Sequence, residues 1–477
     1  MADDITLEEL EEGESEYETD EESEDETDSE EEEDEPKLKY QRLGSTVSEL
    51  LRHDVATAMA LHDKFLALGT KSGQVAILDF NGNMTHNYKP HVHPIQQLSI
   101  ETTGEFVGSC AADGKVVVYG LYTKEKISNS YGRAVLSMAL DPDFAKKETR
   151  QFVSGGHAGK LVLNTKGFLG FGSRDVVLHS GEGPIYAISW SGQLIAWANN
   201  LGVKIYDCNI KQRITYISRP KGSPPPDQYQ CHLMWVAEDT LFIGWADCLK
   251  IAVIKERRDG SSSLPNRYVE IVAILQTDFM ISGVGSFGEY IVLLAFITDD
   301  SSDQEEGRSS KAISSGSPSR PELRILTRAN EEVSSDALSI IGFEKYNVRD
   351  YQLHHLMGES LFYVVSPHDI VMAKPCDLDD HITWLLDREK YSEALEAAER
   401  NEELLKTHKL LDIGERYLNY LISHAKVDVA ASNCQRILKN DPQLWEKWIF
   451  VFAKIRQLKA ISTYIPIHNP TLSDTVY

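Results

Sequence analysis

Long apolar runs, a secretion signal and paired cysteines are all missing from this 477-residue sequence. The longest clear apolar run, "YIVLLAFI" at 290–297, has the length of a strand, whereas a membrane-spanning helix needs about 20 residues. The start, "MADDITLEEL", lacks the basic and apolar regions of a signal peptide. The six cysteines form no Cys-x-x-Cys pair, which fits reduced thiols in a cytosolic protein and argues against zinc or a disulfide framework.

Catalytic signatures are missing too. The sequence has no Gly-x-Ser-x-Gly elbow, no phosphate-binding glycine loop that ends in Lys-Ser/Thr and no His-Glu-x-x-His. His91 and His93 in "HVHP" could begin a metal site, but the sequence fixes no third ligand, so we favour loop histidines in a blade connection. We therefore expect no catalytic residue, no cofactor and no metal, and we predict that the protein is not an enzyme.

Basic residues are absent from residues 1–36, which contain 22 of the 74 acidic residues in the chain. The rest of the chain has 52 acidic residues against 48 Lys and Arg, and this near-neutral balance does not favour nucleic acid. We predict that 1–36 is a disordered acidic tail, either a solubilising appendage or a regulatory segment. Five residues there have an acidic residue three positions on, which suits an acid-directed kinase: Ser15, Thr19, Ser23, Thr27 and Ser29.

A strand–turn–strand pattern recurs through the middle of the chain. It is clear in "FLALGTKSGQVAILD" (65–79) and "FVGSCAADGKVVVYG" (106–120), and three further units lie at 152–163, 194–207 and 241–254. We interpret the turn glycines as structural blade turns that need a positive φ; they are Gly73, Gly114, Gly159 and Gly202, spaced by 41, 45 and 43 residues. In the fifth unit Cys248 takes the equivalent place. This period is typical of WD40-like β-propeller blades.

Two more strand pairs complete the predicted ring. One is 290–298 with 321–327, split by the Ser- and Gly-rich stretch 299–320, and the other is 360–366 with 369–375. We therefore predict a seven-bladed propeller over 37–375, with six or eight blades as alternatives. "KLKYQRL" (37–43) is the candidate for the strand that closes the ring, and 299–320 is expected to be a flexible insertion.

The pattern changes to helical spacing after Cys376. Apolar residues recur at helical intervals in 379–401, 408–425, 428–440 and 442–466. Short helices joined by short turns predict the first hairpins of an α-solenoid over 379–466, and we expect 467–477 to be a frayed end. No polar capping helix follows, so the sequence indicates a chain that has been shortened at its C-terminus.

Several stretches are similar to one known family. They are "DEPKLKYQRLG" (34–44), "DKFLALGT" (63–70), "LIAWANNLGVKIYD" (194–207), "RYVEIV" (267–272) and "RQLKAISTYIP" (456–466). Together they closely resemble the vacuolar protein sorting-associated protein 41 family, which supplies a subunit of the HOPS vesicle-tethering complex. The resemblance extends from about residue 34 to 467, and this chain would be a C-terminally short form of the family.

The resemblance implies a non-enzymatic tether that acts in vesicle-mediated protein transport. Members of that family bridge late endosomes, lysosomes or vacuoles, and autophagosomes before fusion. The implied partners are a late-endosomal Rab GTPase, the adaptor complex of the lysosomal route and the other HOPS subunits. The implied location is cytoplasmic, peripheral on late-endosomal and lysosomal or vacuolar membranes. The chain ends early in the solenoid and has no RING-type Cys/His set, which puts assembly through that part in doubt.

Two other classes of function remain open from the residues alone. A generic WD40 adaptor in ubiquitin ligation or signalling would need no helical array after the propeller, so 379–466 argues against it. A chromatin- or RNA-associated propeller could use the acidic tail to attract basic partners. An enzyme would require a buried carboxylate or histidine cluster in the propeller channel.

Overall fold

The computed structural model describes residues 35–123, 125–167, 172–257, 266–299, 317–356 and 358–473. Ser15, Thr19, Ser23, Thr27 and Ser29 lie outside these residues, as does nearly all of the predicted acidic tail. Most of the predicted insertion 299–320 and the last four residues of the predicted frayed end also lie outside them.

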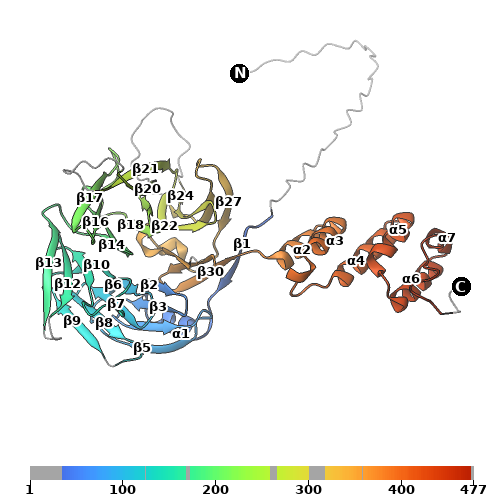
Figure 1. Cartoon of the computed structure of the whole chain (residues 1–477), viewed down its shortest axis with the longest axis horizontal. Coiled ribbons are helices and arrows are strands. Elements are labelled where there is room, and N and C mark those ends of the chain that lie inside the picture. Colours follow the sequence, from blue (N-terminus) through green and yellow to red (C-terminus); the bar gives the residue numbers. More distant parts are fainter. Residues whose placement is uncertain are drawn as a thin grey trace, which may run out of the picture. The chain divides into compact units, whose positions relative to one another are not determined.

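Seven four-stranded antiparallel sheets form the blades of a β-propeller (Figure 1). Blade 1 contains β2 (Ala56–His62), β3 (Phe65–Thr70), β4 (Val75–Leu78) and β5 (Met84–Tyr88). Blade 2 contains β6 (Ile95–Ile100), β7 (Phe106–Ala111), β8 (Lys115–Gly120) and β9 (Lys126–Ser130). Blade 3 contains β10 (Val135–Leu140), β11 (Phe152–Gly156), β12 (Lys160–Lys166) and β13 (Ser173–Ser180). Blades 4 and 5 contain β14 (Ala187–Ser191), β15 (Leu194–Asn199), β16 (Gly202–Asp207) and β17 (Gln212–Ser218); and β18 (Cys231–Trp235), β19 (Thr240–Trp245), β20 (Cys248–Glu256) and β21 (Arg267–Gln276). The predicted fold class and the count of seven blades are confirmed.

Blades 6 and 7 depart from this simple order. Blade 6 contains β22 (Met280–Phe287), β23 (Tyr290–Phe296), β26 (Glu322–Leu326) and β27 (Glu332–Ala337), and the short ribbon of β24 (Thr298–Asp299) and β25 (Ser317–Pro318) lies between its second and third strands. Blade 7 contains β28 (Gln352–Leu356), β29 (Leu361–Ser366) and β30 (Asp369–Pro375), and its fourth strand is β1 (Leu38–Arg42). Because β1 pairs antiparallel with β30, the two ends of the propeller sequence close the ring.

The core lies between the blades. The second strands of the first four blades are buried along their whole length, because a blade inside the ring is covered on both faces. The first strand of each blade lies beside the first strands of its two neighbours, around the channel. Trp197 packs in a cluster that joins blades 3 and 4, and Trp235 and Trp245 pack in the cluster between blades 4 and 5.

The turn glycines adopt positive φ angles at Gly73 (87°), Gly114 (78°), Gly159 (65°) and Gly202 (150°). At Gly73 a Cβ atom would stand 2.4 Å from the backbone oxygen of His91. In the fifth unit Ala246, with φ 54°, is the residue of the turn that has a positive φ. The left-handed residue of this turn is therefore Ala246, two positions before Cys248, and Cys248 is the first residue of β20.

One helix, α1 (Ser45–His53), was not predicted from the sequence. Val47 and Leu51 are its buried residues, and they pack in the cluster that joins blades 1 and 7. Two single-turn 3₁₀ helices, η2 (Phe343–Lys345) and η3 (Val348–Asp350), precede β28.

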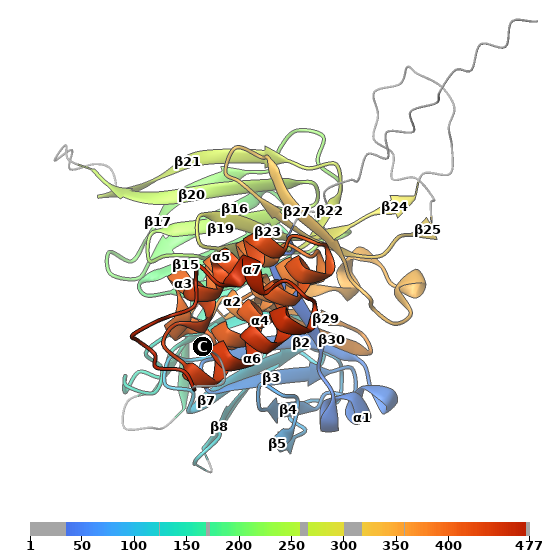
Figure 2. The same cartoon turned by 90° about the vertical axis from the view of Figure 1, so that its right-hand side faces the viewer.

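The C-terminal region is helical, and consecutive helices pack against one another (Figure 2). The helices are α2 (Leu378–Asp387), α3 (Tyr391–Arg400), α4 (Leu410–Ser423), α5 (Val427–Leu438), α6 (Pro442–Lys454) and α7 (Leu458–Ile461), with the 3₁₀ turn η4 (Glu402–Leu404) after α3. Asp441 caps α6 through the N–H groups of Gln443 and Leu444, and Pro442 takes the first helical position, where its missing N–H is harmless. Trp445 and Trp448 lie in the helical core. Among the described residues, the helices are too short or too polar to cross a membrane.

Candidate functional site

The first strands of the blades line a central channel with a volume of about 310 Å³. Gln97 donates from Nε2 to the backbone oxygen of Ile188 (3.2 Å), and Gln352 donates to that of Thr57 (2.7 Å). Each glutamine therefore links the inner strand of its own blade to that of another blade. These two polar side chains thus help to hold the ring together.

Three histidines line the channel: His232, His354 and His355. His354 Nε2 lies 3.0 Å from Oε1 of Gln352. Burial lowers the pKa of each imidazole to about 4, so all three rings are neutral at pH 7. Among the described residues that line the channel there is no Asp or Glu, and the described chain holds no cluster of three or more metal-ligating side chains. Within the described lining, these imidazoles therefore have no carboxylate beside them.

A second polar group surrounds His91, before the first strand of blade 2. Its Nδ1 lies 3.1 Å from the Asp113 carboxylate, and its Nε2 lies 2.9 Å from the Ser109 hydroxyl. The order Ser–His–Asp resembles a hydrolytic triad, but Ser109 is fully buried and its hydroxyl also lies 3.2 Å from the backbone oxygen of Val117. No substrate carbonyl can reach this hydroxyl. The network instead ties the loop before β6 to the β7–β8 turn.

Both histidines of "HVHP" lie in the loop between β5 and β6. His91 is buried, whereas His93 is exposed, so the two rings do not share a site. The contacts of His91 with Ser109 and Asp113 could not be predicted from the loop alone, because these residues lie 18 and 22 positions further along the chain, in the next strand and turn.

Blade 4 has a charged network near its β15–β16 turn. The Lys204 ammonium group is almost fully buried and donates to Glu182, which precedes β14. Asn199 also donates to Glu182 (3.0 Å). The Lys204 ammonium group lies 4.7 Å from the Tyr216 ring centroid, so the cation is enclosed by a carboxylate and an aromatic face.

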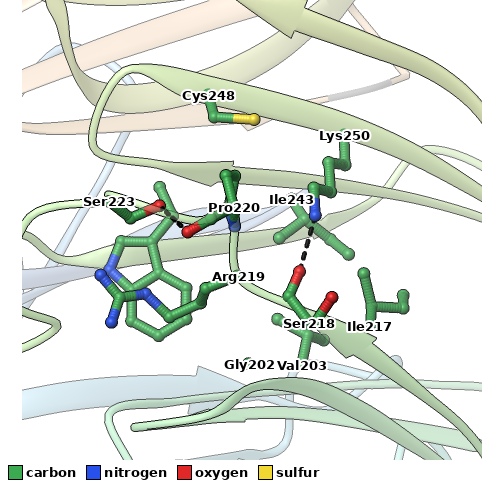
Figure 3. A pocket seen from close by; sticks show the side chains of 11 residues that line it. Gly202, Val203, Ile217, Ser218, Arg219, Pro220, Ser223, Ile243, Cys248 and Lys250 are labelled. Carbon is green, nitrogen blue, oxygen red and sulfur yellow. Dashed lines mark hydrogen bonds between the residues drawn. The ribbon is translucent and has the colours of Figure 1, made fainter.

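Arg219 and Lys250 border a small pocket between blades 4 and 5 (Figure 3). The Arg219 guanidinium group lies 4.8 Å from the Trp245 ring centroid, and burial lowers the pKa of Arg219. Lys250 Nζ donates to the backbone oxygen of Ser218 (2.6 Å). The cavity volume is about 20 Å³, which is the space of a single water molecule. Both cations are therefore already engaged, and the pocket has no room for a ligand.

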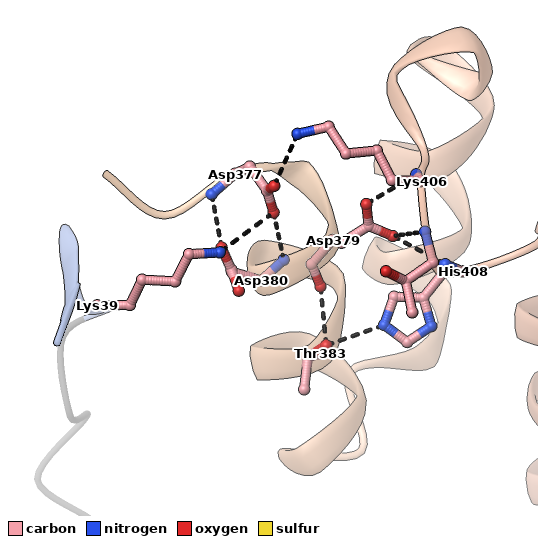
Figure 4. A network of polar contacts seen from close by, with 8 residues as sticks. Lys39, Asp377, Asp379, Asp380, Thr383, Lys406 and His408 are labelled. Carbon is pink, nitrogen blue, oxygen red and sulfur yellow. Dashed lines mark hydrogen bonds and ion pairs between the residues drawn. The ribbon is translucent and has the colours of Figure 1, made fainter. Parts of the chain in front are cut away.

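The junction of β1 with α2 contains a third polar network (Figure 4). Lys39 on β1 pairs with Asp380 on α2, and its ammonium group lies 3.9 Å from Asp377. Asp377 caps α2 by accepting from the Asp380 N–H group (3.2 Å), and Asp380 accepts from the Asp377 N–H group (2.8 Å). This reciprocal arrangement is a capping box. The strand that closes the propeller thus contacts the first helix of the array directly.

Asp379 belongs to the same network and organises the first helical hairpin. Its carboxylate accepts from the backbone N–H groups of Lys406 (2.8 Å), Thr407 (3.0 Å) and His408 (2.8 Å). These N–H groups, that of His408 above all, hold the pKa of Asp379 below its usual value. The carboxylate at the start of α2 therefore fixes the segment that leads into α4.

Comparison with known proteins covers both parts of the chain. The Vps41 family model described as "Vps42 beta-propeller" matches residues 38–375, and that described as "Vps41 TPR-like region" matches residues 412–477. A vacuolar protein sorting-associated protein 41 homolog from Solanum lycopersicum is 43% identical over 465 residues, which is 93% of this chain and 48% of that protein. The Homo sapiens homolog is 44% identical over 447 residues, 93% of this chain and 51% of its own length.

A more distant relative and a solved structure extend this comparison. The Schizosaccharomyces pombe protein of the same name is 30% identical and is covered to 50%. The chain thus spans about half the length of the curated relatives it matches. The crystal structure of the Cps50 (Swd1) β-propeller domain from Myceliophteria thermophila has a TM-score of 0.51 at 15% identity, and the match covers 68% of this chain and 96% of that one. That similarity supports the propeller fold alone.

Proposed function

Because the chain belongs to the Vps41 family, we propose that it serves in vacuolar protein sorting as a non-enzymatic membrane-tethering subunit. The observation that carries this proposal is the match of one chain to both the propeller and the TPR-like region of that family. Its place of action is the cytoplasmic face of late endosomes and of lysosomes or vacuoles, including their fusion with autophagosomes.

The partners that follow from this proposal are the other HOPS subunits, a late-endosomal Rab GTPase and the adaptor complex of the lysosomal route. A tether catalyses no reaction and needs two binding surfaces held apart by a spacer. The propeller supplies loops on a rigid ring, and recognition residues lie mostly on such loops. The helical array supplies length, and weak contacts at the two ends reinforce one another through effective concentration.

The junction at Lys39 supports the spacer part of this proposal. Lys39 and Asp380 join the closing strand of the ring to the first helix, and Asp379 fixes the first hairpin. Both side chains of the Lys39–Asp380 pair are about one-third exposed. An exposed pair of this kind contributes only about 0.2–1 kcal/mol to stability. The pair therefore orients β1 and α2 locally and adds little to the binding of the propeller to the helical array.

Cellular location tests the proposal. The full chain, carrying a fluorescent tag, is expected to concentrate on late-endosomal and lysosomal or vacuolar membranes, and to be released when the late-endosomal Rab is held in its GDP form. A nuclear signal without endolysosomal puncta would contradict the tether and favour a chromatin-associated propeller. A diffuse signal with ubiquitin-ligase subunits as the main co-purifying proteins would favour a generic WD40 adaptor.

A further inference from the structure

The interface between blades 2 and 3 is filled only in part. One part is occupied by a close-packed cluster that includes Phe106, Met138 and Phe152. Beside it lies an open groove with a volume of about 690 Å³. Large apolar side chains also pack between blades 4 and 5 and between blades 6 and 7.

One wall of the groove is a face of the blade 3 sheet. Ser154, Val162 and Val177 form a row across β11, β12 and β13, since Ser154 pairs with Val162 and Val162 with Val177. Gly155 and Gly156 continue this wall, and the other wall is the loop from Tyr131 to Ala134, which links the two blades. The groove crosses three strands, which is the shape of a site for an extended segment.

Two cations stand at this groove without an ionic partner. Arg133 and Lys160 both line it and are exposed, and neither makes an ion pair within the described part of the chain. The contrast with another basic cluster of the propeller, at 145–150, is clear. There Lys147 pairs with Asp141, and the Arg150 guanidinium group lies 4.4 Å from the Phe106 ring centroid.

The groove also has apolar and hydrogen-bonding surface. Val177 is 51% exposed. The Tyr131 hydroxyl is buried near the polar side chains of Asn129, Ser154 and Asn164, and burial raises the pKa of Tyr131 to about 12. It is thus a neutral group at the base of the groove. Asp175 also lines the groove and accepts from Asn164 (2.6 Å), which places one negative charge beside the two positive ones.

We propose that this groove binds an extended acidic peptide segment of a partner protein. Carboxylates of the segment pair with Arg133 and Lys160, and an aliphatic side chain packs on Val162 and Val177. The Asp175 carboxylate can accept hydrogen bonds from backbone N–H groups of the segment. The proposal assigns a peptide-binding role to blades 2 and 3 that does not depend on where in the cell the protein acts.

The test is a selection of random dodecapeptides displayed on phage against the full chain. Enriched peptides are then measured by fluorescence anisotropy on the wild-type chain and on a double variant, Arg133→Glu with Lys160→Glu. The matched control is Lys211→Glu with Lys221→Glu, which reverses two exposed charges on blade 4 and in the loop that follows it. Both double variants should retain the melting temperature of the wild type, since all four side chains are exposed. Val177→Asp tests the apolar wall separately.

The proposal predicts acidic, aliphatic peptides whose affinity falls by roughly tenfold or more in the Arg133/Lys160 variant. It also predicts that Val177→Asp lowers the affinity for these peptides and that the Lys211/Lys221 control variant binds them as tightly as the wild type. Enrichment without acidic residues, or equal affinity for all variants, would overturn it. So would capture of phosphoinositide vesicles, but not peptides, through the same two cations. Peptide binding seen only after removal of residues 1–34 would make this chain's own acidic segment the occupant and would overturn the assignment to a partner.

Discussion

Replacing Asp379 should loosen the first helical hairpin and leave the propeller unchanged. The carboxylate accepts three backbone N–H groups, from Lys406, Thr407 and His408. A hydrogen bond to a charged group contributes about 1.5–3 kcal/mol, but residues 406–407 are exposed, so water replaces part of each lost bond. About 1 kcal/mol for each bond gives a local loss of about 3 kcal/mol for Asp379→Ala.

Hydrogen exchange of the three amides measures this loss directly. At about 1.4 kcal/mol for each factor of ten, Asp379→Ala should speed exchange at residues 406–408 by about 100-fold. Asp379→Asn keeps Oδ1, which accepts from Thr407 and His408, so its effect should be nearer tenfold. Asp412→Asn is the matched control, because Asp412 is an exposed carboxylate in the first turn of α4. Unchanged exchange in Asp379→Ala, or an equal effect in Asp412→Asn, would refute the reasoning.

The same carboxylate gives a pH dependence with a definite sign. The N–H groups lower the folded-state pKa of Asp379, so its contribution is present above the unfolded value of about 3.9 and is lost as the pH falls through the lower folded value. Protection of the three amides should therefore stay constant on acidification to about pH 4 and decline only below it.

Three further predictions concern the propeller. Gly73→Ala should lower its stability by more than about 2 kcal/mol, since a Cβ there meets the His91 backbone oxygen, whereas Gly132→Ala, with open space around its Cβ, should lose only the ~1 kcal/mol of a left-handed alanine; equal unfolding free energies in urea would contradict this. His91→Phe should lower the melting temperature and cost about 2–4 kcal/mol, because it removes the hydrogen bonds of His91 to the Asp113 and Ser109 side chains; a Phe variant as stable as the wild type would show that the network is dispensable. Burial lowers the pKa of His232 and His354 to about 4, so the unfolded chain, with a pKa of about 6.5, takes up protons first. Stability should therefore be nearly full above pH 7 and fall by about 2 kcal/mol for each histidine by pH 5. His354→Gln should reduce that decline, and a melting temperature independent of pH in the wild type would count against neutral histidines in the channel.

The blades could be predicted from the sequence where both faces of a strand are buried. In units such as 65–79, apolar residues form strands on both sides of a turn glycine. The regular spacing of these units along the chain predicts the number of blades. The outer strands have no such signal. In β13 the residues from Ser173 to Val177 are all exposed, so no alternation of buried and exposed positions marks a strand, and pairing with β12 defines it. Helix α1 was missed because just two of its nine residues are buried.

The polar sites were less predictable than the strands. His91 meets Ser109 and Asp113 only after the antiparallel strands of blade 2 have aligned, so the sequence separates what the fold brings together. The Asp379 interaction spans 27–29 residues and involves backbone donors, which leave no trace in side-chain identity. The groove between blades 2 and 3 exists because side chains do not fill that part of the interface. Its shape depends on how the two sheets diverge, which the sequence does not show.

Nucleotide-dependent capture of a late-endosomal Rab by the full chain tests the central claim most directly. The purified chain, with and without residues 1–36, would be offered the Rab in its GTP and GDP forms together with the other HOPS subunits. The tethering account predicts selective retention of the GTP form by both versions of the chain. Equal retention of the two forms, or no retention of either form and capture of chromatin or ubiquitin-ligase proteins instead, would contradict it.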